Sequence, residues 1–298
     1  MTTLAPRAPG RLAGRTHRSR RGESAVSIAV AMTVLFIMAI YCLAPVYVLF
    51  SASTKTQGQI SNGSGLAPSS RLFSNIGTLF GQDDHVYAKW LLNSVIYAVG
   101  GSLIATFLGA LAGYALAKFP FRGRELVFNV VLGGVLMPAT ALALPLFLMF
   151  AKVHLTNTYW SVLLPSIVSP FGVYLSRVFA AASVPDELIE AGRLDGASEF
   201  RIFMQVGVRL MSPALVTIFL FQFVVIWNNF FLPLVMLSNR ALYPVTLGLY
   251  SWQSQTSRLP ILQVLVIVGS LVSVIPLIVM FLALQRFWRN GLSAGSLK

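Results

Sequence analysis

The 298-residue sequence is apolar and basic: 56% of its residues are hydrophobic, 10% are charged, and the formal net charge is +13. A mean hydropathy of +0.75 excludes an ordinary soluble domain, which would need far more polar surface. The positive charge does not indicate a nucleic-acid partner, because the basic residues lie at the ends of apolar segments. The single cysteine, Cys42, excludes an internal disulfide framework, and its apolar surroundings predict a packed thiol.

The first 23 residues form a basic tail with six arginines and one acidic residue. Such a composition predicts a disordered tail, 1–23, at the cytoplasmic surface near anionic lipid. A transit peptide also fits this composition. A cleaved signal peptide is not expected, because the apolar run that follows is too long.

Six charge-free windows follow the tail, each longer than the roughly 20 residues that a helix needs to cross the hydrocarbon core. They are 24–54, 90–117, 126–151, 153–176, 210–239 and 259–285. These windows predict an all-α polytopic membrane protein with six transmembrane helices. The membrane domain would cover 24–289, followed by a short cytoplasmic tail, 290–298. Prolines interrupt several windows, which indicates either simple kinks or broken helices that line a pathway.

The basic residues predict the orientation of these spans. Sixteen of the 22 lysines and arginines fall on the side of the N-terminal tail, and six fall on the other side. The positive-inside rule therefore places both termini, and the loop at 185–213, in the cytoplasm.

The loop at 185–213 is the most polar part of the chain and holds five of the nine acidic residues. Small residues are spaced along it, and small residues let the backbone of another protein come close. The loop therefore predicts a docking surface, although a charged loop can also be merely solvated.

Within the loop we expect two short helices. Ser183 with Asp186 fits a capping box for a first helix that ends near Leu194. Gly196 is then expected at a turn with positive φ, and Asp195 or Ser198 would begin the second helix.

The windows contain no ionisable side chain except His154, near the edge of the fourth. Proton-coupled carriers place such groups in the membrane, so a secondary carrier is disfavoured. The chain has no phosphate-binding Gly-x-x-x-x-Gly-Lys-Ser/Thr motif and no pairing of nucleophile and base. We therefore predict no enzyme activity, no catalytic residues and no metal site.

The fifth window carries an amide–aromatic cluster: Gln222, Trp227, Asn228 and Asn229. Gln222 and Asn229 are seven residues apart, which would place them on one stripe of a helix. Amides beside aromatic rings suit a neutral, hydroxyl-rich solute, yet hydrogen bonding between helices explains them equally well. Asn93 and Ser94, in the second window, are expected to serve packing.

The polar loop resembles a known motif. Glu190-Ala191-Gly192, with Gly196 six positions after Glu190, resembles the EAA loop of bacterial ABC importer permeases. Other stretches are similar to the carbohydrate (maltose-type) subfamily, and the resemblance extends over nearly everything after about Tyr41. These stretches are Leu92-Asn93-Ser94, Tyr114-Ala115-Leu116-Ala117-Lys118-Phe119, Met137-Pro138, Leu144-Pro145-Leu146, Asn157-Thr158-Tyr159, Asp195-Gly196-Ala197-Ser198, Trp227-Asn228-Asn229-Phe230, Pro233-Leu234 and Gly291-Leu292-Ser293-Ala294-Gly295.

The resemblance implies a permease subunit of an ATP-driven, binding-protein-dependent sugar importer, similar to the smaller of two paired permeases. Its implied partners are a second permease, a cytoplasmic ATPase dimer that uses ATP and Mg, an extracytoplasmic binding protein, a sugar and the bilayer of the inner membrane. Glycerol phosphate or a polyol is the alternative solute.

The loop would couple to the ATPase, with its first helix packing the Ala191/Leu194 side inward. The implied coupling residues are Glu187, Glu190, Ala191, Gly192, Asp195, Gly196 and Ala197. Gly192 departs from the motif, which has alanine there, and Arg209 stands where a proline is usual.

Overall fold

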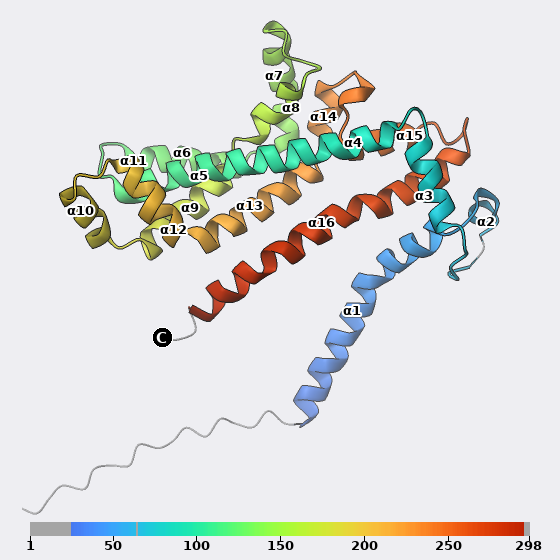
Figure 1. Cartoon of the computed structure of the whole chain (residues 1–298), viewed down its shortest axis with the longest axis horizontal. Helices are drawn as coiled ribbons and strands as arrows, with labels where there is room; N and C mark the ends of the chain where they lie inside the picture. Colours follow the sequence, from blue (N-terminus) through green and yellow to red (C-terminus); the bar gives the residue numbers. More distant parts are fainter. Residues whose placement is uncertain (1–24, 64, 295–298) are drawn as a thin grey trace, which may run out of the picture. The chain divides into compact units, whose positions relative to one another are not determined.

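The computed structural model describes residues 25–63 and 65–294, and every regular element within them is helical (Figure 1). The prediction of an all-α fold is confirmed. In chain order the elements are α1 (Ala25–Ser53), α2 (Gln57–Ser61), α3 (Leu72–Gly81), α4 (Val86–Val95), η1 (Ile96–Gly100), α5 (Gly101–Lys118), α6 (Arg124–Val135), α7 (Ala139–Lys152), α8 (Tyr159–Ser166), α9 (Pro170–Ser183), α10 (Asp186–Leu194), α11 (Glu199–Ile202), η2 (Phe203–Gly207), α12 (Val208–Leu210), α13 (Ser212–Trp227), α14 (Phe231–Met236), η3 (Arg240–Leu242), α15 (Val245–Gln253) and α16 (Ile261–Ala294). The predicted tail at 1–23 lies outside the described residues, and α16 continues into the predicted C-terminal tail as far as Ala294.

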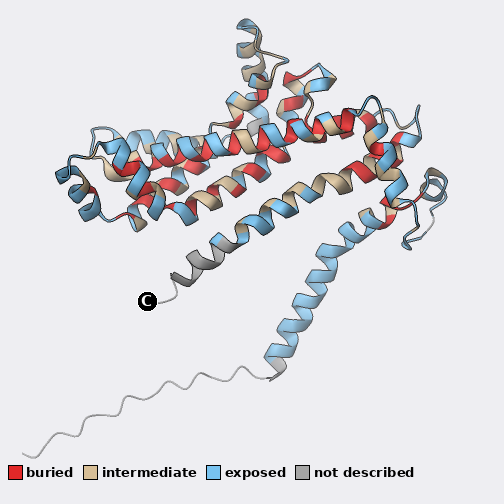
Figure 2. Ribbon diagram, in the orientation of Figure 1, coloured by how far each residue is buried: buried red, intermediate tan, exposed pale blue. Residues whose placement is uncertain are grey.

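The chain divides into two compact units, Met1–Tyr47 and Val48–Lys298. The described part of the first unit is most of α1, which is apolar on all sides and exposed along its length (Figure 2). Such a helix fits a lipid surrounding. Cys42 is exposed on it, so the prediction of a packed thiol is wrong for the isolated chain. The apolar side chains around Cys42 belong to its own helix and do not cover it.

Four helical stretches in the described chain are long and apolar enough to cross a membrane: Ser27–Ser53, Val86–Lys118, Tyr159–Ser183 and Ile261–Gln285. Two more become spans if each bent pair counts as one. These are Arg124–Val135 with Thr140–Lys152, bent by 104°, and Glu199–Leu210 with Ser212–Trp227, bent by 82°. The described residues therefore hold four apolar spans, or six if each bent pair is one span, against the six that the windows predict.

Helices α5 and α9 approach closely along a seam of small residues. A Cβ built on Gly109 would lie 3.2 Å from the backbone of Gly172, and one on Gly113 would lie 2.4 Å from the Cβ of Ser176. Only glycine fits at Gly113, because the nearby atoms include the backbone of Arg177. Close backbone approach through small residues is the usual basis of helix packing in membranes.

The second unit has a buried cluster at each end. The tryptophan cluster gathers around Tyr87, Trp90, Phe223 and Trp252, where α4, α13, α15 and α16 meet. The tyrosine cluster gathers around Tyr114, Ile189, Ile202, Phe203 and Met211, beneath α10 and α11.

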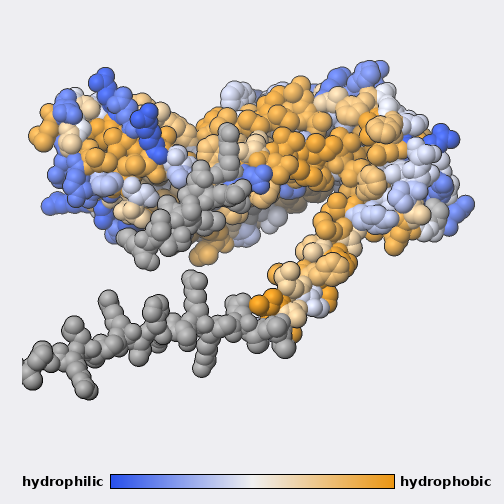
Figure 3. Space-filling model, turned by 60° about the horizontal axis from the view of Figure 1, so that its bottom comes forward, coloured by the Kyte–Doolittle hydropathy of each residue, from blue (hydrophilic) through white to orange (hydrophobic). Residues whose placement is uncertain are grey.

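The surface of this unit follows the same division. In the view of Figure 3 a broad apolar zone separates hydrophilic patches at its two ends, as a membrane-embedded surface requires.

Candidate functional site

The first part of the polar loop is the nine-residue helix α10. It begins at Asp186, directly after Pro185, whose side chain makes no capping hydrogen bond. The predicted capping box with Ser183 is therefore wrong: α9 continues to Ser183, and the extended Val184 and Pro185 separate the two helices. Asp186 and Glu187 still lie in the first turn, where the helix dipole favours negative charge.

The end of α10 is as predicted. Gly196 has φ +74°, and its N–H donates to Arg193 O, while the Ala197 N–H donates to Gly192 O. These two bonds form the glycine-terminated cap that satisfies the last carbonyls of a helix. Ser198 then begins α11, because its hydroxyl accepts the N–H of Arg201.

Glu190 is exposed on α10 as expected, but the side of the helix that packs inward is a different one. The buried residue is Ile189, and Gly192 lies so close to Ile202 that a Cβ there would meet its Cγ1 at 3.0 Å. Leu194 is 89% exposed and Ala191 is exposed, so the predicted inward packing of that side is wrong. Ile189 fills the tyrosine cluster instead, and Gly192 makes the close approach to Ile202 possible.

The exposed face of α10 brings most of the predicted coupling residues together. Glu187, Glu190, Ala191 and Leu194 recur at helical spacing on that face. Asp195 and Gly196 are exposed just beyond it, and no atom lies within 4 Å of a Cβ built on Gly196. Gly192 and the half-buried Ala197 face the tyrosine cluster instead, so their role is to support this surface.

Charged groups hold α10 at both of its ends. Lys118, the last residue of α5, donates to Asp186 Oδ1 at 2.8 Å. Arg193 donates to Glu199 Oε1 at 2.6 Å, and its guanidinium lies 6.0 Å from the centre of the Phe119 ring. The hydrogen bond to Glu199 raises the pKa of Arg193, so this guanidinium stays charged at neutral pH. The sequence analysis missed Lys118, whose only indication was its place in the motif at 114–119.

The fifth window is not one helix. Helix α13 ends at Trp227, and the chain resumes in α14 after a break at 228–230. Proline explains the break, because Pro233 has no N–H for the carbonyl of Asn229 and its ring would clash with that carbonyl. The Thr246 hydroxyl donates to this carbonyl at 3.0 Å instead. Gln222 and Asn229 therefore do not share a helical stripe.

The amide of Gln222 supplies the hydrogen bond that Pro170 removes at a second break, before α9. Pro170 opens α9 and cannot donate to the carbonyl of Ser166, four residues earlier. Gln222 Nε2 donates to that carbonyl at 3.1 Å, and its Oε1 accepts the Ser169 hydroxyl at 3.0 Å. Trp227 is 97% buried and stacks on Phe223 in the tryptophan cluster, 5.6 Å between ring centres.

Two predicted pathway residues lie at the break itself. Asn228 is exposed, and its amide donates to Val224 O within α13. Asn229 is half-buried, and its Oδ1 accepts the N–H of Leu232 at 3.4 Å. Both amides keep hydrogen-bonding capacity for a further partner.

The segment beyond α14 is bound to α4 and η1 through its backbone. Asn93 donates to the carbonyls of Ala241 and Tyr243 at 2.8 and 3.0 Å and accepts the Tyr159 hydroxyl at 2.7 Å. The Ser94 hydroxyl accepts the Val245 N–H at 2.7 Å. The prediction that Asn93 and Ser94 serve packing is confirmed. The polar atoms of Asn93 are fully used, as a buried amide requires.

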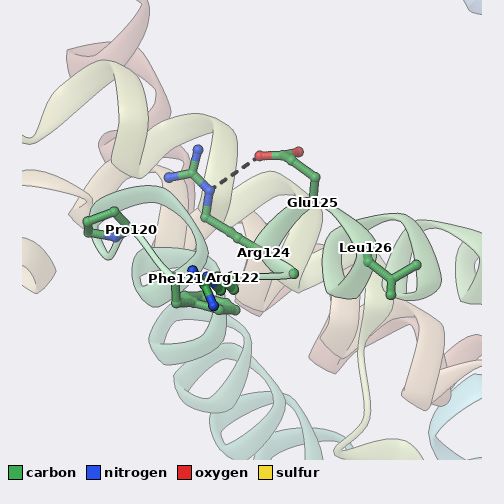
Figure 4. Close-up of a pocket in the computed structure, with 7 residues that line it drawn as sticks. Pro120, Phe121, Arg122, Arg124, Glu125 and Leu126 are labelled. Atoms are coloured by element: carbon green, nitrogen blue, oxygen red, sulfur yellow. Dashed lines mark hydrogen bonds and ion pairs between the residues drawn. The ribbon is translucent and has the colours of Figure 1, made fainter.

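The turn between α5 and α6 carries a small hollow, lined by residues 120–126 and shown in Figure 4. Arg124 points toward Glu125 there, at 3.3 Å, and Glu125 also accepts from Arg177 of α9 at 2.5 Å. The hollow is formed by one short stretch of chain, and its charges serve to attach the turn to α9. Across the described residues, no group of three His, Cys, Asp or Glu side chains could hold a metal ion.

The fold has a close counterpart among solved structures. It matches a chain of a bacterial ABC transporter involved in the import of the acidic polysaccharide alginate, with a TM-score of 0.77 and 23% identity. The match covers 90% of this chain and 98% of that chain. The match shows that the two chains share one fold, in which apolar spans, some of them bent, end in a helix exposed at one end.

Sequence comparison gives the family. The chain belongs to the family described as binding-protein-dependent transport system inner membrane component, which matches residues 105–290. It is 31% identical to the arabinooligosaccharides transport system permease protein AraQ of Bacillus subtilis (strain 168), over 90% of this chain and 95% of that protein. It is 32% identical to the lactose transport system permease protein LacG of Rhizobium radiobacter, over 90% and 96%.

Membership fixes the general role. The chain is a multi-pass inner-membrane permease subunit of an ATP-driven importer and not an enzyme. The EAA motif belongs to this family, and membership implies in general a partner permease, an ATPase and a binding protein.

Proposed function

We propose that the chain forms half of the translocation pathway for a sugar or oligosaccharide and that α10 docks on a cytoplasmic ATPase. The observation that carries the docking proposal is the exposed face with Glu187, Glu190, Ala191 and Leu194. Leu194 is 89% exposed, and covering its side chain with another surface would stabilise the complex by roughly 1.5–3 kcal/mol. The two carboxylates would pair with basic groups of the ATPase, which binds ATP and Mg.

The proposed pathway runs past the break at 228–230. Asn228 and Asn229 present amides that donate to and accept from hydroxyl groups. Gln222 and Trp227 act behind them, because Gln222 closes the Pro170 break and Trp227 packs in the tryptophan cluster. A sugar is favoured over glycerol phosphate or a polyol because the relatives are described as permeases for arabinooligosaccharides and lactose. The ATP-driven family also disfavours a secondary carrier.

In the proposed orientation both termini and α10 face the cytoplasm. The excess of basic residues on that side supports this orientation. With Cys42 replaced, single cysteines at 61–63 or 251–255 should react with an impermeant reagent from outside. Cysteines at 187–200 should not react, and the reverse pattern would overturn the orientation.

Leu194→Glu tests the docking proposal most directly, because it puts a charge on the most exposed apolar residue of that face. We expect the ATPase subunit recovered with the permease to fall at least tenfold. Glu190→Lys, which adds repulsion, and Gly196→Val, which strains a residue with φ +74°, should act in the same direction.

Arg122→Gln is the matched control, since it changes the net charge by the same amount on an exposed residue of the neighbouring turn. Recovery of the ATPase with Arg122→Gln should equal that of the wild type. Normal recovery with both Leu194→Glu and Glu190→Lys would show that α10 is not the docking element.

Asn228→Leu and Asn229→Leu test the pathway. We expect sugar uptake to fall at least tenfold while the complex assembles normally, because both residues lie at the break and outside the buried clusters. Gln222→Leu should instead reduce the amount of folded protein, since it leaves the Ser166 carbonyl without its donor. Wild-type uptake by both asparagine variants would remove these residues from the pathway.

A further inference from the structure

One helical span connects the two regions of the proposed function. Residues Val86–Lys118 form a stretch of 33 residues through α4, η1 and α5, drawn in teal in Figure 1. No proline interrupts it. Its C-terminal end contacts α10, and its N-terminal part contacts the segment that follows the break.

Where the span meets α10, the consecutive residues Lys118 and Phe119 contact the first and the last turn of that helix. The Lys118 side chain is only 7% exposed, although its partner Asp186 is 74% exposed. The lysine is therefore fixed within the second unit, and the partner lies on the helix that would move. Phe119, the next residue, lies under the guanidinium of Arg193 in the last turn of α10.

At the other end, side chains of the span bind backbone atoms of residues 240–245. Trp90 Nε1 donates to Arg240 O at 2.9 Å, and Tyr97 Oη donates to Leu242 O at 3.0 Å. Asn93 and Ser94 add the three bonds described above. Because all five bonds go to main-chain atoms, they fix the position of this segment whatever its side chains are.

The middle of the span, between these two attachments, is packed closely against α9. Gly109 and Gly113 seat α5 on α9 so closely that their packing leaves no room for a methyl group at Gly113. Closely packed elements move together and shift between discrete arrangements instead of deforming continuously.

We propose that the span Val86–Lys118 transmits the displacement of α10 to residues 240–245. This segment follows the break that holds Asn228 and Asn229. Lys118 and Asn93 are the two positioning residues of the span. The inference rests on the proposed function, since it takes α10 as the docking element and the break as part of the pathway. The inference adds the mechanical connection between α10 and the break.

Lys118→Met tests the α10 end, because it keeps the length of the side chain and removes its charge. We expect the maximal rate of sugar uptake to fall at least tenfold in the assembled complex. The sugar concentration for half-maximal uptake should stay within twofold, and recovery of the ATPase should stay within twofold of the wild type. Arg122→Met, which removes a neighbouring exposed charge, should leave uptake unchanged.

The exchanged pair Lys118→Asp with Asp186→Lys gives a test of rescue. It should restore at least a third of wild-type uptake, whereas each single change should not. Wild-type uptake by Lys118→Met, or no rescue by the exchanged pair, would overturn the role of Lys118.

Asn93→Asp tests the other end, since it keeps the acceptor for Tyr159 but loses the donors to Ala241 and Tyr243. Uptake should fall at least tenfold without loss of the ATPase. Tyr97→Phe removes one bond of the same set, and its uptake should fall about threefold; it decides the question if Asn93→Asp does not fold. Wild-type uptake by the folded variants would overturn the role of this end.

Leu194→Glu, measured in the same preparations, separates this inference from the proposed function. If Leu194→Glu keeps the ATPase bound, and Glu190→Lys does so as well, the docking proposal fails. If Leu194→Glu releases the ATPase while Lys118→Met transports normally, the docking proposal stands and the transmission fails.

Discussion

The two ends of the span Val86–Lys118 are held by opposite kinds of interaction. Around Trp90 and Asn93, neutral buried side chains donate to backbone carbonyls. Around Lys118, charged pairs hold α10: Asp186 is 74% exposed although the Lys118 side chain is only 7% exposed, and Arg193 and Glu199 are 44% and 45% exposed. An exposed pair contributes about 0–1 kcal/mol, whereas leaving a buried polar group unpaired costs about 1–3 kcal/mol.

The difference separates a fixed end of the span, around Trp90 and Asn93, from an adjustable end, around Lys118. A helix that must take up two positions against a partner benefits from contacts that exchange at low cost in free energy. A segment beside a pathway benefits from contacts that keep it in one place.

Gly248→Ala should damage the fixed end most. A Cβ on Gly248 would lie 2.2 Å from two ring atoms of Trp90, which is itself fully buried. Overpacking of this kind should lower the free energy of unfolding by about 3 kcal/mol. Thermal unfolding of the purified permease measures the effect. Gly77→Ala in α3, where nothing lies within 4 Å, should not lower the unfolding temperature. Equal unfolding temperatures for the two variants would contradict the contrast.

Tyr159→Phe should weaken the same end by one bond. It removes the hydroxyl that donates to Asn93 Oδ1 at 2.7 Å, and the cost should be about 1 kcal/mol. Tyr174→Phe provides the comparison, because Tyr174 is exposed and its change should stay within about 0.5 kcal/mol. A smaller loss of stability for Tyr159→Phe than for Tyr174→Phe would show that the hydrogen bonds of Asn93 do not stabilise this end of the span.

The pair between Asp83 and Arg240, at 2.8 Å, predicts a weak pH dependence near the fixed end. Partial burial opposes ionisation of Asp83, but hydrogen bonds from Arg240 and Gln82 outweigh it and lower the pKa of the carboxyl. A lowered folded pKa stabilises the protein above the unfolded pKa, and this stability is lost as pH falls through the folded pKa.

The stability difference between wild type and Asp83→Asn should therefore be constant from pH 7 to about pH 5 and should shrink below about pH 4. It should stay below about 1 kcal/mol, because both side chains are more than a third exposed. A difference that grows as the pH falls would contradict the assigned sign.

Gly192→Ala, near the adjustable end, should have the smallest effect. Alanine favours the helix by about 1 kcal/mol, while its Cβ would lie 3.0–3.2 Å from the buried Ile202 side chain, which would have to shift slightly. We expect the gain in helix propensity and the cost of the contact with Ile202 to cancel to within about 0.5 kcal/mol. Unfolding temperature and ATPase recovery should both match the wild type. A loss above about 1 kcal/mol would mean that Ile202 has no room to move.

Local chemistry explains what the sequence predicted well. Gly196 and Ser198 define the end of α10 and the start of α11 through bonds within a few residues. The apolar windows predicted the spans for the same reason, since length and composition are local properties.

Several failures involve partners that are distant in sequence, although the capping box at Ser183 failed for a local reason. The break after Trp227 depends on Pro233 together with Thr246, and the role of Gln222 depends on Ser166, 56 residues earlier. The inward face of α10 depends on Ile189 and Ile202 filling the tyrosine cluster. No periodicity of the single sequence contains this information.

The glycine seam also has a consequence for the order of events during synthesis. Gly113 leaves the ribosome about 60 residues before Ser176, which is roughly 3–12 s at ordinary rates of translation. During that interval α5 presents to lipid, or to the insertion machinery, a groove that only α9 fills. A nascent chain stalled between the two helices would leave the glycine seam of α5 without the helix that covers it in the folded protein.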